Sequence, residues 1–387
     1  MKLNYSKNFW IIAVALFFYM ISFNLLLPEM NEFISDLGGE NYKGLIIALF
    51  TIFAGLSRPF SGKLSDLIGR KKVMMIGMII GAIITALYPF TGVVLFFLSL
   101  RLLHGFSAGF LPTGATAMVS DVLAPEQRGR GMGIWGVFIS LGIGIGQYTG
   151  TPVKQIFGLN GLFMIATSAC LFSGVLITLL RETLPNPQKF KWSMLKIQWD
   201  DAFDPSVMPA AVVMFLSAVS SGIIFVVTPD MGLYLNIENK GWFFGVYVLS
   251  TILIRAFGGG ISDKIGRRKT LIGGMIILII SMTTVAFCTS LVVYTAGAVL
   301  FGVATGIASP TLFAWTADLS KPERRGVGSG TLFIALEFGI LLGALSTLVT
   351  YNNTFDSIPI VFLFGSLLAL FSLLYLIWHL RYRQSNT

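Results

Sequence analysis

The chain has 387 residues and a formal net charge of +9; 55% of its residues are hydrophobic and only 12% are charged. Its mean hydropathy of +0.80 lies far above that of a water-soluble domain. The composition therefore excludes a soluble globular protein and predicts one that spans a membrane.

Apolar runs long enough to cross a bilayer recur along the whole chain. Crossing about 30 Å of hydrocarbon takes roughly 20 helical residues, and backbone groups in lipid need partners within their own segment, so runs of this length must be helices. The first run leads into Pro28, Glu29 and Met30 rather than a small-residue cleavage site, which predicts a retained helix. The predicted spans are 9–30, 44–62, 73–90, 93–119, 131–151, 161–180, 208–231, 241–259, 270–289, 291–316, 327–350 and 359–379. The sequence thus predicts an all-α membrane protein with twelve transmembrane helices.

The cations are divided unequally between the two sets of loops. Most of the 27 lysines and arginines fall on the side that holds both termini, whereas the other side carries only Lys43, Lys154 and Lys240. Because loops rich in Lys and Arg stay in the cytoplasm, both termini are predicted to be cytoplasmic. The basic charge is thereby explained by topology, and no nucleic-acid partner is expected.

The sequence contains an internal repeat. Residues 56–72 and 253–269 agree at ten of seventeen positions, where chance would give about one. A second pair of blocks, 121–131 and 318–328, shares an Asp, a Pro, a Glu, an Arg and two glycines at the same offset of 197 residues. The repeat predicts two halves that each contain six spans.

The predicted domains follow from this repeat: a half at 1–180, a cytoplasmic linker at 181–207 and a second half at 208–387. The first and seventh spans also end alike, with Leu-Pro-Glu-Met at 27–30 and Thr-Pro-Asp-Met at 228–231. Parallel repeats of this kind are typical of transporters whose substrate site lies between the halves, near the middle of the bilayer.

The linker has two interpretations. Its aromatic and apolar residues alternate with lysines, as in a short helix that lies on the membrane surface. A plain tether between the halves is the alternative. The residues concerned are Phe190, Trp192, Leu195 and Trp199, with Lys189, Lys191 and Lys196 between them.

The repeated stretch also carries a family resemblance. From Gly62 it reads Gly, three residues, Asp66, Leu67, one residue, Gly69 and three cations, and in the second copy Lys264 follows the aspartate. This pattern resembles the loop after the second helix of the major facilitator superfamily, in which a cation follows the Asp. Over its whole length the chain resembles that superfamily, which implies a fold of two pseudo-symmetric six-helix bundles.

The resemblance implies that these loops form a cytoplasmic gate. In the family the aspartate meets the start of helix 11 and a nearby arginine when the transporter faces outward; by symmetry the second aspartate meets the start of helix 5. The alternative is that the loops only end the helices and fix the topology. The residues predicted for the gate are Gly62, Asp66, Gly69, Arg70, Arg128, Arg130, Asp263, Gly266 and Arg267.

Arg101 and His104 are placed on one face of the fourth span, about 13 Å into the membrane. An arginine at this depth is costly and usually faces a wet cavity or a partner. Arg101, Gly105 and Gly109 also resemble the family's helix 4 motif, whose arginine is linked to proton transfer. The alternatives are a structural hydrogen bond for Arg101 and a packed, non-titrating role for His104.

Glu337 is the only carboxylate predicted to lie deep inside a span, and the equivalent position in the first half is Ser140. Features that serve both halves should be repeated, so an unmatched buried acid is the better candidate for binding substrate or a proton. Burial and nearby cations shift a carboxyl pKa in opposite directions, which suits alternate loading and release. The alternative is a fixed ion pair, with Arg101 as a candidate partner.

Helix 5 departs from the drug-antiporter branch of the family, where it ends in Gly-Pro and then Gly-Gly. Here the corresponding residues are Gly146-Gln147 and Gly150-Thr151. Gln147, and Asn24 on the first span, are predicted either to line the cavity or to form an interhelical hydrogen bond. The residues predicted to form cavity walls are Phe17, Phe23, Trp315 and Phe338.

These observations predict a secondary active transporter that exports small, partly hydrophobic compounds in exchange for protons. An uptake symporter or facilitator for a polar metabolite is the alternative, and a non-transporting receptor or lipid translocator is more remote. The sequence has no nucleotide-binding loop, its two cysteines give no metal or disulfide pattern, and no cofactor is expected. The expected setting is a bacterial cytoplasmic membrane, with the chain acting as a monomer.

Overall fold

The computed structural model describes residues 5–124, 128–197, 203–257, 261–321 and 324–384. The regular elements among these residues are all helices. They form two compact units: unit 1 consists of Met1–Met30 and Ile52–Gln198, and unit 2 of Asn31–Thr51 and Trp199–Thr387. Each unit is described separately below.

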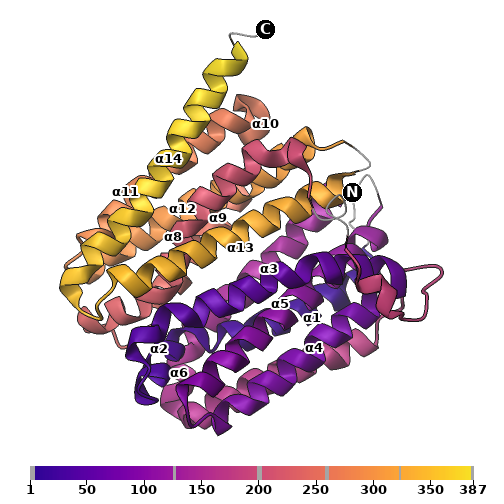
Figure 1. Ribbon diagram of the computed structural model, residues 1–387, viewed down its shortest axis with the longest axis horizontal. Coiled ribbons are helices and arrows are strands. Elements are labelled where there is room, and N and C mark those ends of the chain that lie inside the picture. The colour runs from indigo at the N-terminus through magenta and orange to yellow at the C-terminus, as the bar shows by residue number, and fades with distance from the viewer. Residues whose placement is uncertain (1–4, 125–127, 198–202, 258–260, 322–323, 385–387) are drawn as a thin grey trace. The chain divides into compact units, whose positions relative to one another are not determined.

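Unit 1 is built from long helices that run alongside one another (Figure 1). α1 packs against α6, and α4 packs against both α5 and α6. α6 comprises two of the predicted spans, separated at Gly158, where φ is 70° and only glycine is free of strain. The elements of this unit are α1 (Lys7–Asn24), η1 (Leu27–Glu29), the part of α3 (Lys43–Ile68) from Ile52 onward, α4 (Arg70–Leu87), α5 (Val94–Val122) and α6 (Arg128–Thr178).

Unit 2 repeats this packing. α8 lies against α13 and α14, α11 lies against α12 and α14, and α9 packs against α12. Its longer helices are α8 (Met208–Tyr234), α9 (Trp242–Phe257), α11 (Arg267–Ala286), α12 (Leu291–Leu319), α13 (Arg325–Thr350) and α14 (Ile358–Gln384). The unit also contains α10 (Ile261–Ile265), the start of α3 and nearly all of α2 (Met30–Asp36).

The predicted membrane spans are confirmed. Ten helices in the described part of the chain are long and apolar enough to cross a bilayer, and one of them, Gly131–Thr178, covers two predicted spans. The remaining span is the shorter apolar helix Trp242–Ala256. The chain is therefore an all-α, multi-pass membrane protein with twelve transmembrane helices.

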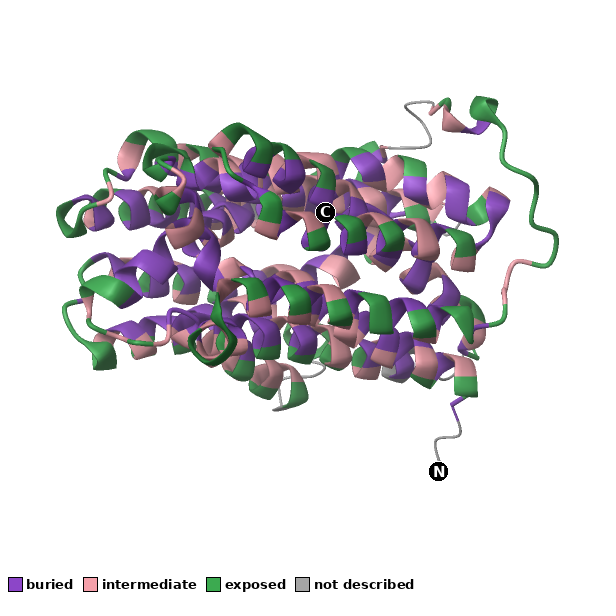
Figure 2. Ribbon diagram, turned by 90° about the horizontal axis from the view of Figure 1, so that it is seen from below, coloured by how far each residue is buried: buried purple, intermediate pink, exposed green. Residues whose placement is uncertain are grey.

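The distribution of buried and exposed side chains is that expected of a membrane protein. Buried and exposed residues alternate along the helices (Figure 2), and large apolar side chains such as Leu95, Val292 and Val349 are almost fully exposed. Such side chains would be unfavourable on a water-soluble surface, but they suit contact with lipid.

Helix packing confirms the internal repeat. A Cβ atom at Gly109 of α5 would lie 1.7 Å from Oγ of Ser57 on α3, and one at Gly306 of α12 would lie 2.0 Å from Cγ2 of Ile254 on α9. Both the glycines and the residues they face are 197 positions apart. The two halves thus share the same close helix contact.

Where the sequence allowed a surface helix, the linker has a short 3-10 helix at Trp192–Leu195, and a second one, Pro205–Val207, lies at its end. Met194 is buried among Leu64, Val73 and other apolar residues of unit 1. The backbone N–H of Gln188 also donates to the carbonyl of Leu67 at 2.8 Å. This part of the linker is therefore docked on unit 1, while Trp199 lies outside the described residues.

Candidate functional site

Three buried polar side chains meet at α5 in unit 1; we call them the Arg101 cluster. Arg101 and His104 are one helical turn apart on α5 and only 3% and 1% exposed. The hydroxyl of Tyr88, from the short helix η3 (Tyr88–Phe90), lies 3.0 Å from Nδ1 of His104 and also interacts with Arg101. Phe23 of α1 lies beside the cluster, with its ring centre 6.1 Å from that of His104. The two predicted polar residues are thus held together by a tyrosine that was not singled out from the sequence.

Asn24 and Gln147 form a second polar contact in unit 1. Nε2 of Gln147 donates to Oδ1 of Asn24 at 2.9 Å, and Asn24 donates to the carbonyl of Met20 at 2.8 Å. α1 and α6 can approach here because Gly146 has no side chain: a Cβ atom there would lie 3.0 Å from Cβ of Asn24. Within the described part of the chain, the buried Oε1 of Gln147 has no hydrogen-bond partner. The pair therefore keeps one acceptor available for a donor group.

Glu337 lies in α13 of unit 2 and is 8% exposed. The predicted wall residues are distributed over both units. Phe17 and Phe23 belong to unit 1, where the ring of Phe17 is 6.4 Å from that of Phe138. In unit 2, Trp315 is buried 5.8 Å from the ring of His379, whereas Phe338 is exposed. Their role as cavity walls remains a prediction.

The first loop of the predicted gate is organised by Arg70. Its guanidinium donates to Asp66 at 2.6 Å, to Asp121 of α5 at 3.2 Å and to the carbonyl of Ser65 at 2.6 Å. Gly69 precedes it with φ of 117°, a conformation that L side chains avoid. The aspartate is thus oriented by an arginine of its own loop, while 71% of its side chain stays exposed.

The second loop repeats this network in unit 2. Arg267 donates to Asp263, to Asp318 of α12 at 2.9 Å and to Oγ of Ser262 at 2.7 Å, and Gly266 has φ of 93°. Each of these residues lies 197 positions after its counterpart in the first loop. Gly62, the remaining predicted glycine, lies inside α3. The side chains of Arg128 and Arg130 lie outside the described part of the chain.

At the end of the molecule opposite these loops, which we call the outer end, one buried carboxylate lies in η1, just after α1, and another lies near the end of α8. In unit 1, Glu29 accepts hydrogen bonds from Oγ1 of Thr151 at 2.6 Å and from Nζ of Lys154 at 3.0 Å. In unit 2, Asp230 is only 4% exposed. It accepts hydrogen bonds from Lys43 at 2.7 Å, Asn31 at 3.0 Å and Tyr351 at 2.8 Å.

These outer carboxylates were missed by the sequence interpretation. The signal was present in the repeated Pro-Glu-Met and Pro-Asp-Met that end the first and seventh spans. The three lysines on the cation-poor side were a second indication of these carboxylates, but the sequence interpretation used them only to assign the topology. Each of the three is in an ion pair: Lys154 with Glu29, Lys43 with Asp230 and Lys240 with Glu32.

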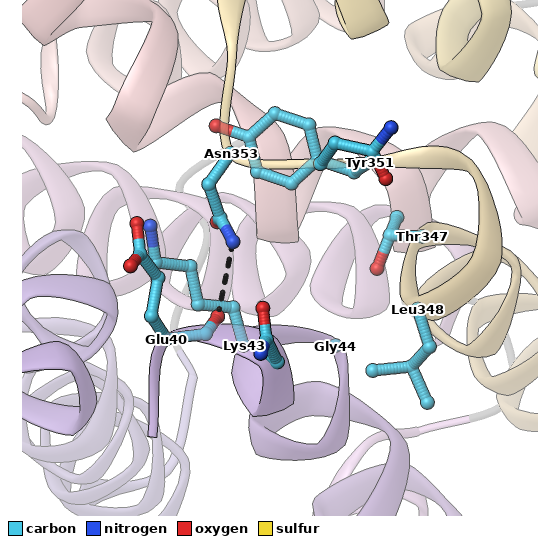
Figure 3. A pocket seen from close by; sticks show the side chains of 9 residues that line it. Glu40, Lys43, Gly44, Thr347, Leu348, Tyr351 and Asn353 are labelled. Carbon is cyan, nitrogen blue, oxygen red and sulfur yellow. Dashed lines mark hydrogen bonds between the residues drawn. The ribbon is translucent and has the colours of Figure 1, made fainter. Parts of the chain in front are cut away.

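A polar pocket of about 190 Å³ in unit 2 is lined in part by Lys43 and Tyr351 (Figure 3), both of which donate hydrogen bonds to Asp230. The start of α3 forms one wall, and the end of α13 with the residues after it forms the other. Burial, and then the charge of Asp230, raise the pKa of Tyr351, so its hydroxyl stays protonated and donates to the carboxylate. The lining residues are Glu40, Asn41, Lys43, Gly44, Thr347, Leu348, Tyr351, Asn352 and Asn353.

No cluster of three or more His, Cys, Asp or Glu side chains that would suit a metal ion occurs among the residues with a described placement. The buried polar groups described above are an arginine, a histidine, amides and carboxylates that lie apart from one another.

Two repeated helical units with charged groups buried inside membrane-spanning helices define a membrane transporter. The sequence pattern of the Major Facilitator Superfamily matches residues 12–208 and 210–386, and the chain belongs to this superfamily. It is a transporter and not an enzyme.

Known proteins resemble the chain over most of its length. It is 27% identical over 334 residues to a "multi-drug resistance efflux pump PmrA homolog" of Lactococcus lactis, covering 83% of this chain and 82% of that protein. It is 25% identical to an uncharacterized MFS-type transporter of Methanocaldococcus jannaschii, over 88% of this chain and 90% of that one. The crystal structure of the nucleoside transporter NupG shares the fold, with a TM-score of 0.78, 13% identity and coverage of 96% and 99%.

Proposed function

We propose that the protein works by alternating access and exports small, partly hydrophobic compounds in exchange for protons. The observation that carries this proposal is the buried Glu337, a carboxylate inside a membrane-spanning helix with no counterpart in the first half. A carboxylate in that position is costly, and it is retained where it binds a proton or a charged solute. Arg101, the buried cation of unit 1, supplies the opposite charge in the proposed cycle.

The proposed direction of transport is outward. The relative from Lactococcus lactis carries the name of a multidrug efflux pump homolog, which supports export. The chain also contains 33 phenylalanines and 15 methionines, side chains that adapt to varied apolar solutes. A transmembrane potential of about 100 mV supplies roughly 2.3 kcal/mol for each proton, enough to bias such a cycle.

Uptake or facilitated passage of a polar metabolite is the second candidate. It is favoured by Asn24 and Gln147, because the buried Oε1 of Gln147 needs a hydrogen-bond donor that an apolar drug would not provide. The substitution Gln147→Leu distinguishes export of apolar compounds from transport of a polar metabolite. Transport of hydroxylated or amino-bearing solutes should fall selectively if this candidate is right, whereas an exporter of apolar compounds should keep its activity.

The proposed cellular location and the proposed gate both follow from the charged loops. We place the protein as a monomer in a bacterial cytoplasmic membrane with both termini inside, following the distribution of cations. Asp66 and Asp263, each held by the arginine of its loop, form the cytoplasmic gate. Protons and a small-molecule substrate are the partners, together with the bilayer itself.

Transport into vesicles tests proton coupling. The purified protein is reconstituted with a pH-sensitive dye inside, and candidate drugs are added with the wild type and with Glu337→Gln. We expect substrate-dependent proton flux in the wild type and at least a tenfold loss in the variant, because the amide cannot take up a proton.

Glu238→Gln is the matched control, since Glu238 is exposed in a loop. It should leave the flux unchanged. Solute movement without proton flux in the wild type would refute proton coupling, and full coupling in Glu337→Gln would refute the assignment of the site.

A further inference from the structure

We infer that residues 183–196 of the linker, which we call the strap, hold the first gate loop in position and make it unlike the second gate loop. This inference rests on the proposed role of these loops as a cytoplasmic gate. The strap and the first loop, around Asp66 and Arg70, both belong to unit 1. The contacts between them therefore lie within a single unit.

Met194 anchors the strap to the end of α3. Its side chain is 7% exposed and lies in an apolar cluster with Leu64 and Ile68 of that helix, and Leu67 packs against the same cluster. Leu64, Leu67 and Ile68 are spaced by three and four positions, so they share one face of the helix. The strap covers this face. Asp66 lies on the opposite face and keeps 71% of its side chain exposed.

Two hydrogen bonds attach the strap to α3 on either side of Met194. The backbone N–H of Gln188 donates to the carbonyl of Leu67 at 2.8 Å. That carbonyl belongs to the last turn of α3, where a helix has no acceptor partners of its own to offer. Nζ of Lys63 donates to the carbonyl of Lys196 at 2.7 Å. The strap is thus held to the helix before and after its apolar anchor.

Thr183 connects the strap to the arginine network of the first loop. Its Oγ1 donates to Oδ2 of Asp121 at 2.6 Å, and Nε of Arg70 donates to the same oxygen at 3.2 Å. Arg70 also binds Asp66 at 2.6 Å, so the position of the Asp121 carboxylate affects where the guanidinium and the gate aspartate lie. Thr183 is therefore a positioning residue that acts on Asp66 through Asp121 and Arg70.

The second loop shows what the strap changes. Ile68 is 5% exposed, whereas its repeat mate Ile265, 197 residues later, is 52% exposed. Within the described part of unit 2, Ile265 thus lacks an equivalent cover. Leu67 packs under the strap, while its repeat mate Lys264 is exposed. Because a charged side chain is costly to bury, leucine suits the covered loop and lysine the uncovered one.

Hydrogen exchange of the full chain in detergent tests the strap without substrate or a pH gradient. In the parent, residues 64–68 should exchange at least about tenfold more slowly than residues 261–265. Leu67→Lys gives the first loop the residue of the second and should displace the strap. Exchange at 64–68 should then rise about fivefold. Leucine and lysine have similar helix propensities, so the substitution itself should not unwind α3.

Lys264→Leu is the matched control, because it makes the reverse substitution at the repeat position. It should leave exchange at 261–265 as in the parent. If Leu67→Lys does not fold, Met194→Ser gives an independent test, since it changes a linker residue outside the membrane spans and should also accelerate exchange at 64–68.

Thr183 is tested with a conservative pair of variants. Thr183→Val removes the hydroxyl donor and should raise exchange at residues 66–69 about threefold, whereas Thr183→Ser keeps the donor and should retain the parent's rates. Unchanged exchange at 64–68 in Leu67→Lys and Met194→Ser, or equal effects of the two Thr183 variants, would overturn the inference. Normal transport by Asp66→Asn in vesicles would instead refute the proposed gate, and the exchange rates would still decide whether the strap holds the loop.

Discussion

Gly109 illustrates how single residues set the spacing of the helices. A Cβ atom at this position would lie 2.8 Å from the backbone carbonyl of Ala54 as well as against Ser57. The backbone cannot move away without moving α3, so even a methyl group overpacks the contact.

We therefore expect Gly109→Ala to destabilise the protein by about 1–3 kcal/mol, measured as a lower midpoint of thermal unfolding in detergent. Gly273→Ala in α11 is the control, because a Cβ atom there has no neighbour within 4 Å and alanine favours the helix. Equal effects of the two substitutions would contradict the packing argument.

The start of α4 shows how an element is fixed by a residue distant in the sequence. Glu182 accepts hydrogen bonds from the backbone N–H groups of Arg70 at 3.0 Å and Lys71 at 3.1 Å, which are the first two residues of the helix. A carboxylate at this end also complements the helix dipole. The repeat position of Glu182 is His379, which has no carboxylate to offer the start of α11.

Replacing Glu182 with Ala should cost about 0.5–2 kcal/mol, because two backbone donors lose their partner. Hydrogen exchange should accelerate at residues 70–73 and stay unchanged at 267–270. Asp36→Asn, an exposed acid at the end of α2, serves as the control. Unaltered exchange at the start of α4 would show that the cap has no effect.

At the scale of the whole molecule, residues 31–51 lie early in the chain but pack within unit 2. Asn31 bonds to Val226 of α8, and Gly44 lies against Ala344 of α13. A chain divided after Gln198 should therefore reassemble from its two fragments. We expect tagged 1–198 to co-purify 199–387 when the two are expressed together, and Asn31→Ala with Lys43→Met in the tagged fragment to reduce the yield. Fragments that purify separately would contradict this expectation.

The sequence was sufficient for the spans and the repeat, because hydrocarbon thickness fixes the length of each apolar run and duplication leaves a constant offset. It did not identify the partners of Arg70, since Asp121 lies 51 residues away and no local pattern joins them. The pairing of Lys43 with Asp230, across 187 residues, depends likewise on how the helices pack. Burial of Arg101, His104 and Glu337 agrees with the prediction, whereas their roles stay predictions.

The tyrosine at position 351 also has an evolutionary consequence. Gene duplication starts with two copies of each interaction, and at this position the first half keeps Lys154 bound to its own Glu29. In the second half the equivalent residue is Tyr351, which donates a hydrogen bond to Asp230 but brings no positive charge. The positive charge that pairs with Asp230 comes instead from Lys43. The difference between Lys154 and Tyr351 thus accompanies an ion pair within the first half in one case, and an ion pair between residues from the two halves of the sequence in the other.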